Sequence, residues 1–359
     1  AILIVSGFFV SNTGVALALT NVNLTSPNGG DYWSGTRNIT WNADCGTGDT
    51  VNIYYSTDGF ANSSVRIAKD VPCNSESYNW DTTSVSDGST YRIKVADSND
   101  VPGVYDISDA DFTIDNIAPT GYSVNIDQDQ IYSGNDNALS FTFSGAETGA
   151  IYNYSITSSG GGTAVTGTGS ITSATQQITD IDVSGLGDGT LTLTVYLTDA
   201  AGNQGGDQTD TVAKDSTAPT LTSVSIASDN ANTKMAKVGD TVILTFTSSE
   251  AIQTPTVTIA GQSANVTGSD TSWTATYTMT NTDTEGVVPF TIDFADTVSN
   301  TGTQVTGTTD SSSVTFDKTA PTISSVDSDG QIFNSGVHKI TVVFSEPLAT
   351  APKIAIATA

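Results

Sequence analysis

In the stretch SWTATYTMT, at residues 272–280, the side chains of Trp, Ala, Tyr and Met alternate with threonine. Because successive side chains of a β-strand point to opposite faces of the sheet, this alternation predicts a strand with one face in a core and one in water. Residues 241–246 and 191–197 repeat the alternation, and clusters of Gly, Asn and Asp separate such runs. The pattern indicates short strands joined by tight turns and excludes a helical protein.

One motif, D-x-x-A-P-T, recurs at residues 115–120, 215–220 and 317–322. Its prolines are 100 and then 102 residues apart, which matches the size of one immunoglobulin-like sandwich. Proline has no N–H to give to a sheet, so each motif ends the strand before it and marks a joint between domains. We therefore predict an all-β chain of tandem immunoglobulin-like antiparallel β-sandwiches arranged as an elongated array.

The joints predict three complete units, at residues 19–117, 118–217 and 218–319. Residues 320–359 begin like another unit, because KITVVFSEPL at 339–348 parallels the strand region at 241–252. This segment is much shorter than the roughly 100 residues that a sandwich takes. We expect it to be the truncated start of a further Ig-like domain in a longer array.

Residues 1–18, AILIVSGFFVSNTGVALA, form an apolar segment that ends in an A-x-A pattern. One interpretation is the remnant of a signal peptide that is cleaved after Ala18. The other is an apolar arm that inserts into a neighbouring subunit as a donated strand. Both place the protein outside the cell or at its surface, and the polar residues in the segment argue against a membrane span within this chain.

The chain carries 38 acidic residues against 11 basic ones, for a formal net charge of -27. A nucleic-acid-binding protein needs a cationic face to displace counterions, so this class is excluded. One histidine and the absence of C-x-x-C or H-E-x-x-H motifs exclude ordinary zinc sites and most histidine-dependent catalysis. No catalytic residue is predicted.

The first unit contains LTSPNGGDYW at residues 24–33, followed by ITW at 39–41, YNW at 78–80 and YRIKV at 91–95. In this order the segments resemble the Kre9/KNH-like, Ser-Thr-rich cell-surface domain. The resemblance implies an extracellular β-sandwich with no catalytic residues. We expect its large aromatic residues to pack in the core, and a sugar-stacking platform is the alternative; they are Trp33, Trp41 and Trp80.

The second and third units carry LTDAAGN at residues 197–203 and ADTVSN at 295–300 ahead of their D-x-x-A-P-T joints. These segments look like the bacterial Ig-like repeats of large surface proteins and adhesins. Such repeats are implied to act as spacers or stalks. The third unit departs from the usual D-x-x-G-N, since Ser299 stands where glycine is usual.

Calcium is the best cofactor candidate, because a hard cation prefers carboxylate, amide and carbonyl oxygens, and each unit offers a set near its joint. The candidate ligands are Asp97, Asn99 and Asp115 in the first unit, Asp199, Asn203 and Asp215 in the second, and Asp296, Asn300 and Asp317 in the third. Asp and Asn are also the ordinary turn residues, whose side chains bond nearby backbone amides. Both interpretations stay open from the sequence.

Cys45 and Cys73 lie in the same unit, and an even pair in an exported chain indicates a disulfide. Free buried thiols are the alternative. No charged motif beside either residue favours a reactive thiol.

The leading hypothesis is a non-enzymatic structural or adhesive segment of a secreted or cell-surface multidomain protein, serving as a stalk or as adhesion modules. One alternative is a set of accessory modules of a secreted hydrolase whose catalytic domain lies elsewhere. Another is an extracellular filament subunit with an N-terminal donated strand. The expected partners are cell-surface, polysaccharide or neighbouring-subunit contacts.

Overall fold

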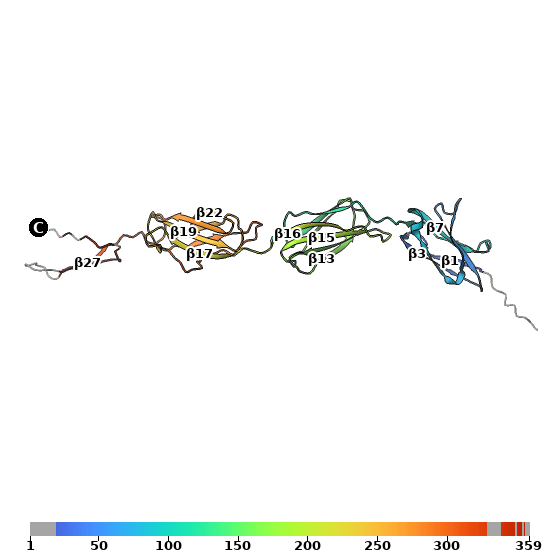
Figure 1. Cartoon of the computed structure of the whole chain (residues 1–359), viewed down its shortest axis with the longest axis horizontal. Helices are drawn as coiled ribbons and strands as arrows, with labels where there is room; N and C mark the ends of the chain where they lie inside the picture. Colours follow the sequence, from blue (N-terminus) through green and yellow to red (C-terminus); the bar gives the residue numbers. More distant parts are fainter. Residues whose placement is uncertain (1–18, 329–338, 349, 354, 356–359) are drawn as a thin grey trace, which may run out of the picture. The chain divides into compact units, whose positions relative to one another are not determined.

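The computed structural model describes residues 19–328, 339–348, 350–353 and 355 (Figure 1). The predictions for the segment 1–18 lie outside these residues. In the described chain, the regular structure is β-strand apart from two short 3-10 turns, so the prediction of an all-β protein is confirmed. Three separate hydrophobic cores form, from buried residues within 19–114, 122–212 and 224–316.

The first sandwich packs a three-stranded sheet against a larger one. The small sheet has the order β1-β3-β6, with β1 at Val22–Ser26, β3 at Thr36–Ala43 and β6 at Ser77–Asp81. The larger one has the order β2-β9-β7-β4-β5, and β8 also pairs with β7. Its strands are β2 (Tyr32–Trp33), β4 (Thr50–Ser56), β5 (Val65–Pro72), β7 (Gly88–Asp97), β8 (Tyr105–Ile107) and β9 (Phe112–Ile114). The 3-10 turns are η1 (Cys73–Ser75) and η2 (Thr82–Ser84).

The tryptophans of the first sandwich are core residues. Trp33, Trp41 and Trp80 are all buried, and the rings of Trp33 and Trp80 meet edge-on with centroids 6.5 Å apart. A sugar-stacking platform needs an exposed ring face, so that alternative is wrong for these three residues.

The second sandwich has a three-stranded and a four-stranded sheet. The first has the order β10-β11-β14, with β10 at Ser123–Ile126, β11 at Leu139–Ser144 and β14 at Gln177–Ile181. The second has the order β13-β12-β15-β16, with β12 at Ile151–Ser158, β13 at Val165–Ser170, β15 at Gly189–Thr198 and β16 at Gln208–Lys214. On β15 the leucines and Val195 are buried while the residues between them face outward, as their alternation predicts.

The third sandwich contains the stretch that decides the fold. Strand β23 (Ser272–Thr278) buries Trp273 and Ala275 and turns its threonines outward. It belongs to a sheet of order β17-β19-β23-β22, with β17 at Leu221–Ser228, β19 at Thr241–Ser248 and β22 at Asn265–Ser269. The facing strands form two short sheets, β21-β20-β25 and β18-β26-β24. Their bounds are β18 (Met235–Ala236), β20 (Thr256–Ile259), β21 (Gln262–Ser263), β24 (Gly286–Val287), β25 (Phe290–Asp293) and β26 (Thr315–Phe316).

One pairing in each sandwich departs from the predicted antiparallel pattern. Strand β2 pairs parallel with β9, Ile131 forms a parallel bridge to Lys214, and β18 pairs parallel with β26. In each case the chain leaves the first sheet after its first strand and lies beside the last strand of the other sheet. The last strand therefore gains a second neighbour, which covers an edge that would otherwise be open to pairing with another chain.

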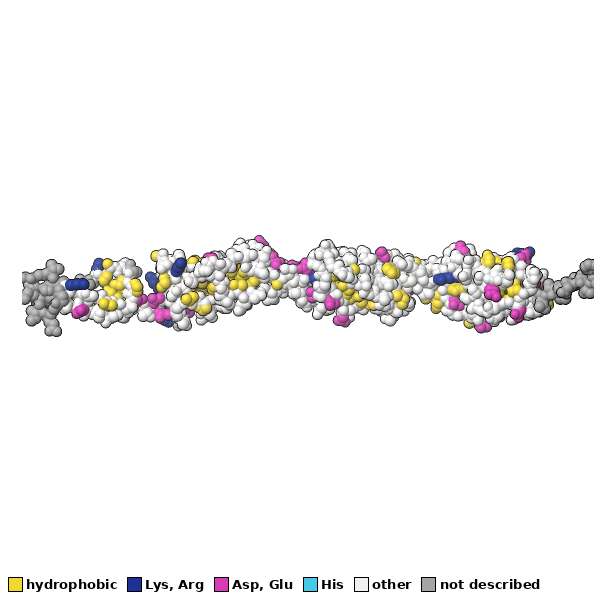
Figure 2. Space-filling view, turned by 90° about the horizontal axis from the view of Figure 1, so that it is seen from below, with side chains coloured by type: hydrophobic (Ala, Val, Ile, Leu, Met, Phe, Trp, Pro, Cys, Tyr) yellow, Lys and Arg dark blue, Asp and Glu magenta, His cyan; other side chains and the backbone are white. Residues whose placement is uncertain are grey.

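Beyond the third sandwich, β27 (Ile323–Ser328) and β28 (Ile340–Phe344) form an antiparallel ribbon. Several of its apolar side chains stay exposed, namely Ile323, Val326 and Val343. Figure 2 shows acidic side chains scattered over one face of the molecule. No helix in the described residues is long and apolar enough to cross a membrane.

Candidate functional site

The loop after β15 is a tight turn organised by one carboxylate. Asp199 Oδ1 accepts hydrogen bonds from the backbone N–H groups of Ala201 and Asn203, each at 2.9 Å. Its Oδ2 accepts a third from Asn203 Nδ2 at 2.8 Å. We call residues 199–203 the joint loop of the second sandwich.

The third sandwich builds the same loop from different residues. Asp296 Oδ1 accepts from the N–H groups of Val298 and Asn300 at 2.9 Å, and Oδ2 accepts from Asn300 Nδ2 at 2.7 Å. Ser299 takes a φ of 82° where the second sandwich has Gly202 at 93°. The departure from glycine therefore leaves the turn intact and places a side chain in the strained left-handed region.

Asn203 connects the joint loop to the first sandwich. Its Nδ2 also donates to the backbone carbonyl of Asp115 at 2.8 Å, and its Oδ1 accepts from the Ser34 hydroxyl. Arg37 donates from its guanidinium to the carbonyl of Ala201 at 2.9 Å. The first and second sandwiches form one compact unit, and these contacts define what we call the joint.

The Ser-Gly pair that the first sandwich brings to the joint recurs in the second sandwich. Ser34-Gly35 follows β2, and Ser133-Gly134 follows the parallel bridge at Ile131. Ser133 N donates to Asn300 Oδ1 at 2.9 Å, so the asparagine at the end of D-x-x-x-N accepts from a serine here as well. The serine was absent from the sequence-based site, although its recurrence before a glycine was a detectable signal.

The joint gathers negative charge. Burial of one side of Glu147, in the loop after β11, raises the pKa of its carboxyl group, and the carboxylates of Asp199 and Asp115 raise that pKa further. In the third sandwich, Glu250 holds the corresponding place after β19, and its carboxylate lies within 4.8 Å of that of Asp296. The sequence-based candidates missed Glu147 as a member of this group.

The three predicted calcium sets do not come together. Strand pairing sets Gly88 opposite Ile114, Gly189 opposite Lys214 and Gly286 opposite Phe316. Each terminal aspartate therefore lies at the far end of its sandwich from its intended partners. In the first two sandwiches the ten residues of β7 and of β15 separate them by about 30 Å, and in the third the segment that contains β24 and β25 lies between them. This separation applies to Asp97 and Asn99 against Asp115, to Asp199 and Asn203 against Asp215, and to Asp296 and Asn300 against Asp317. The three sets do not form as groups, because antiparallel pairing brings the last strand back to the opposite end of each sandwich, and calcium binding by the individual residues stays a prediction.

Most of these acidic side chains hold turns. Asp97 is buried, and its carboxylate accepts from Asn99 Nδ2 at 3.5 Å and from the N–H of Val101 at 3.3 Å. Asp115 and Asp317 each accept from the backbone N–H two residues later, at Ile117 and Thr319. These contacts agree with the interpretation of Asp and Asn as turn-formers.

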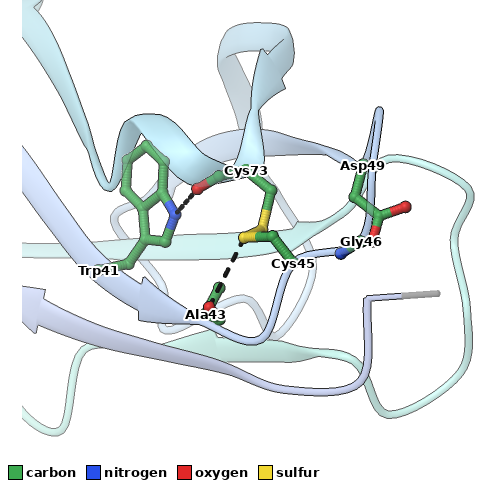
Figure 3. Close-up of a disulfide and its surroundings, with 6 residues drawn as sticks. All are labelled: Trp41, Ala43, Cys45, Gly46, Asp49 and Cys73. Carbon is green, nitrogen blue, oxygen red and sulfur yellow. Dashed lines mark hydrogen bonds between the residues drawn. A yellow bond between two sulfur atoms is a disulfide. The ribbon is translucent and has the colours of Figure 1, made fainter. Parts of the chain in front are cut away.

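A disulfide joins Cys45 to Cys73, which are 28 residues apart in the sequence (Figure 3). It ties the loop after β3 to η1 at the edge of the first core, where Cys73 is buried. The Trp41 indole N–H donates to the Cys73 carbonyl at 3.2 Å, and Cys73 N donates to the Asp49 carbonyl at 2.9 Å. The bridge thus fixes a loop that has little regular structure of its own.

Comparison with known proteins finds similar solved structures only. No family model and no curated protein matches the chain. A tetra-tandem repeat from the extending region of a large adhesion protein is 19% identical, with a TM-score of 0.27, and the match covers 83% of this chain and 74% of that one. The FN1–FN3 domains of chicken CNTN1 are 12% identical, with a TM-score of 0.27, and the match covers 84% of this chain and 99% of that one. Fibronectin(III)-like modules of Clostridium thermocellum CbhA are 13% identical, with a TM-score of 0.26, and the match covers 54% of this chain and 93% of that one.

These similarities are too low to transfer any function. The resemblance of the first unit to the Kre9/KNH-like domain finds no support among them. The description of the chain as tandem Ig-like β-domains rests on its own three cores and sheet pairings.

Proposed function

We propose that the chain is a non-enzymatic spacer within a secreted or cell-surface multidomain protein, and that the joint sets the relation between consecutive sandwiches. The observation that carries this proposal is the position of Asn203. One side chain closes the turn on Asp199 and also contacts Ser34 and Asp115 of the preceding sandwich. A flexible linker would need no such contacts.

Two further features support the proposal, the first for an extracellular location and the second for a spacer. The Cys45–Cys73 disulfide persists in oxidising compartments and is rare in a reducing cytosol. The net charge of -27 makes neighbouring sandwiches repel one another, which keeps tandem domains soluble and discourages edge-to-edge association.

Calcium at the joint is the second part of the proposal. The carboxylates of Glu147 and Asp199 offer hard oxygen ligands, and burial together with the negative charges of Asp199 and Asp115 raises the pKa of the Glu147 carboxyl group. The turn bonds on Asp199 leave room for a cation, since a carboxylate has about four lone-pair sites. In the third sandwich, Glu250 and Asp296 hold the places of Glu147 and Asp199, and their carboxylate oxygens lie within 4.8 Å of one another.

The test compares the full chain in calcium with the same chain in EDTA. We expect calcium to raise the melting temperature and to narrow the distribution of inter-domain distances seen by small-angle scattering. Magnesium at equal ionic strength is the control for screening. If calcium and EDTA give the same melting curve and the same scattering, the cation is rejected. If the scattering also describes freely jointed domains in both, the spacer role of the joint fails with it.

A further inference from the structure

The outer face of the four-stranded sheet in the second sandwich is hollowed. A groove of about 690 Å³ lies over β12, β13 and β15 and reaches the loop before β16. Its floor is made of small residues such as Ser155, Thr194 and Gly167, and Tyr196 supplies an aromatic ring. The pairings of Thr168 with Asn153 and of Asn153 with Tyr196 put these three side chains in one row across the sheet.

Four polar side chains of this groove are not used by the protein, whereas the Thr168 hydroxyl donates to the Tyr152 carbonyl at 2.8 Å. Within the described part of the chain, the side chains of Asn153, Tyr196, Gln204 and Asp207 form no hydrogen bond with another protein group. Gln204 and Asp207 are exposed, and Asn153 and Tyr196 are partly exposed. Two amides, a phenol and a carboxylate therefore line one groove, and their donors and acceptors are available to a ligand.

The third sandwich shows that this arrangement is not a general property of the fold. Counting back from the aspartate of D-x-x-x-N, Asp293 holds the place of Tyr196 and Thr291 that of Thr194. There the groups pair with one another, because Gln304 donates to Asp293 at 2.7 Å and the hydroxyls of Thr258 and Thr291 lie 2.8 Å apart. The same strand positions are satisfied internally in one sandwich and left open in the other.

The chemistry of the groove selects its ligand. A sugar presents hydroxyls that both donate and accept, which suits amides and a carboxylate, and an apolar C–H face, which suits an aromatic ring. No lysine or arginine lines the groove, and Asp207 together with the net charge of -27 repels an anionic ligand. A peptide strand needs a sheet edge for its backbone groups, whereas this groove offers side chains on a sheet face.

We propose that this groove binds a neutral oligosaccharide, with Tyr196 stacking on a sugar ring and Asn153, Gln204 and Asp207 bonding its hydroxyls. The row of Thr168, Asn153 and Tyr196 crosses three strands and spans about 10 Å, so the groove takes a short run of sugars rather than one ring. Its central side chains stand on β12 and β15, the inner strands of the sheet, and are therefore held in place before the ligand arrives. The second sandwich thereby gains an adhesive role in addition to that of a spacer.

The test is affinity electrophoresis of the full chain through gels that contain dextran, soluble starch, mannan, galactomannan or alginate. Calorimetry then follows with oligosaccharides of the polymer that retards the chain. All runs contain EDTA, so the outcome is independent of calcium at the joint. We expect retardation by at least one neutral polymer, at least tenfold weaker binding for Tyr196→Ala, and near-native binding for Tyr196→Phe, which keeps the ring.

The matched control is Thr192→Ala. Thr192 lies on the outward face of the same strand as Tyr196, nearer the start of the strand and outside the groove. It should bind as the wild type does. The melting temperatures of all variants are compared, since a change on this face leaves the core intact. Retardation by none of the neutral polymers, retardation by alginate alone, or equal binding by Tyr196→Ala would each overturn the proposal.

Discussion

The side-chain amide of Asn203 donates to the backbone carbonyl of Asp115, 88 residues earlier in the chain, at 2.8 Å. The same nitrogen donates to Asp199 within its own loop. One amide therefore couples the fold of a turn to the placement of the neighbouring domain. Weakening either function weakens the other.

Replacing Asn203 with alanine should lower the stability of the second sandwich by about 1–3 kcal/mol, because the Asp199 carboxylate and the Asp115 carbonyl each lose a donor. The measurement is urea unfolding of the full chain, followed by tyrosine fluorescence. Asn265→Ala is the matched control, since Asn265 is an exposed residue of β22. Equal midpoints for the two variants would contradict the structural role of Asn203.

Arg37→Ala tests the contact between the two sandwiches without changing the hydrogen bonds of the Asp199 turn. Arg37 reaches the carbonyl of Ala201 from the first sandwich and takes no part in the Asp199 turn. We expect a wider distribution of inter-domain distances by scattering, with the unfolding midpoint of the second sandwich unchanged. A distribution identical to that of the wild type would show that this contact does not orient the domains.

Glu147→Gln should stabilise the protein at pH 7 in the absence of divalent cations. The pKa of Glu147 is raised, so the folded state loses stability as pH rises from the unfolded value near 4.5 through the folded one, and the full penalty remains above it. Glutamine carries no such penalty. The gain should vanish below about pH 4, where the wild-type carboxyl is protonated in both states.

Glu285→Gln is the control of opposite sign. The Thr319 hydroxyl and the N–H of Lys318 bond to the Glu285 carboxylate and lower its pKa. Its contribution is therefore present above the unfolded pKa and is lost as pH falls. Thermal melts from pH 3 to 8 should show Glu147→Gln above the wild type and Glu285→Gln below it at neutral pH. The same sign for both would refute the electrostatic explanation.

Lys214 and Asp188 form an ion pair in the second sandwich. Nζ lies 3.2 Å from Asp188 Oδ1, and the lysine side chain is only 1% exposed. Asp188→Asn takes a carboxylate away from a buried ammonium and should cost roughly 1–3 kcal/mol. Lys214→Met should cost less or even stabilise, because methionine needs no charged partner. Calorimetric melting of both variants decides, and a larger loss for Lys214→Met would contradict the prediction.

The disulfide should stabilise the first sandwich by roughly 3.5 kcal/mol, from the entropy of closing a loop of 28 residues in the unfolded chain. Cys45→Ser with Cys73→Ser removes it without leaving a free thiol. We expect the melting transition of the first core to fall, while the transitions of the other two cores stay in place. A double variant that melts as the wild type does would show that the packing of Trp41 and η1 suffices.

The alternation of apolar and polar residues predicts the strands well, because the side to which a strand residue points is set by its position relative to its neighbours in the sequence. The alternation at 272–280 placed Trp273 and Ala275 in the core, and both are buried. The parallel pairing of β2 with β9 could not be read in this way, since two residues carry too short a pattern. The same limit applies to Ile131.

The site was harder to predict than the fold. Asp199 and Asn203 were chosen correctly as members of one loop, but Asp215 was added because it precedes the same joint motif. Strand direction sends Asp215 to the other end of the sandwich, and docking of two domains brings Asp115 instead. Contacts between domains depend on surfaces that a single sequence does not pair, and Ser34 and Arg37 were missed for that reason.

The chain enters the second sandwich beside Tyr122, whose hydroxyl donates to Gly206, and leaves it after Lys214, where Asp215 N donates to the Ile131 carbonyl. The entry and the exit therefore lie at opposite ends of β16. A pull on the two ends would act along the strands and load the ladder between β15 and β16 in shear, so that its hydrogen bonds would have to break together rather than one after another. The route of the backbone makes this sandwich suited to carrying tension.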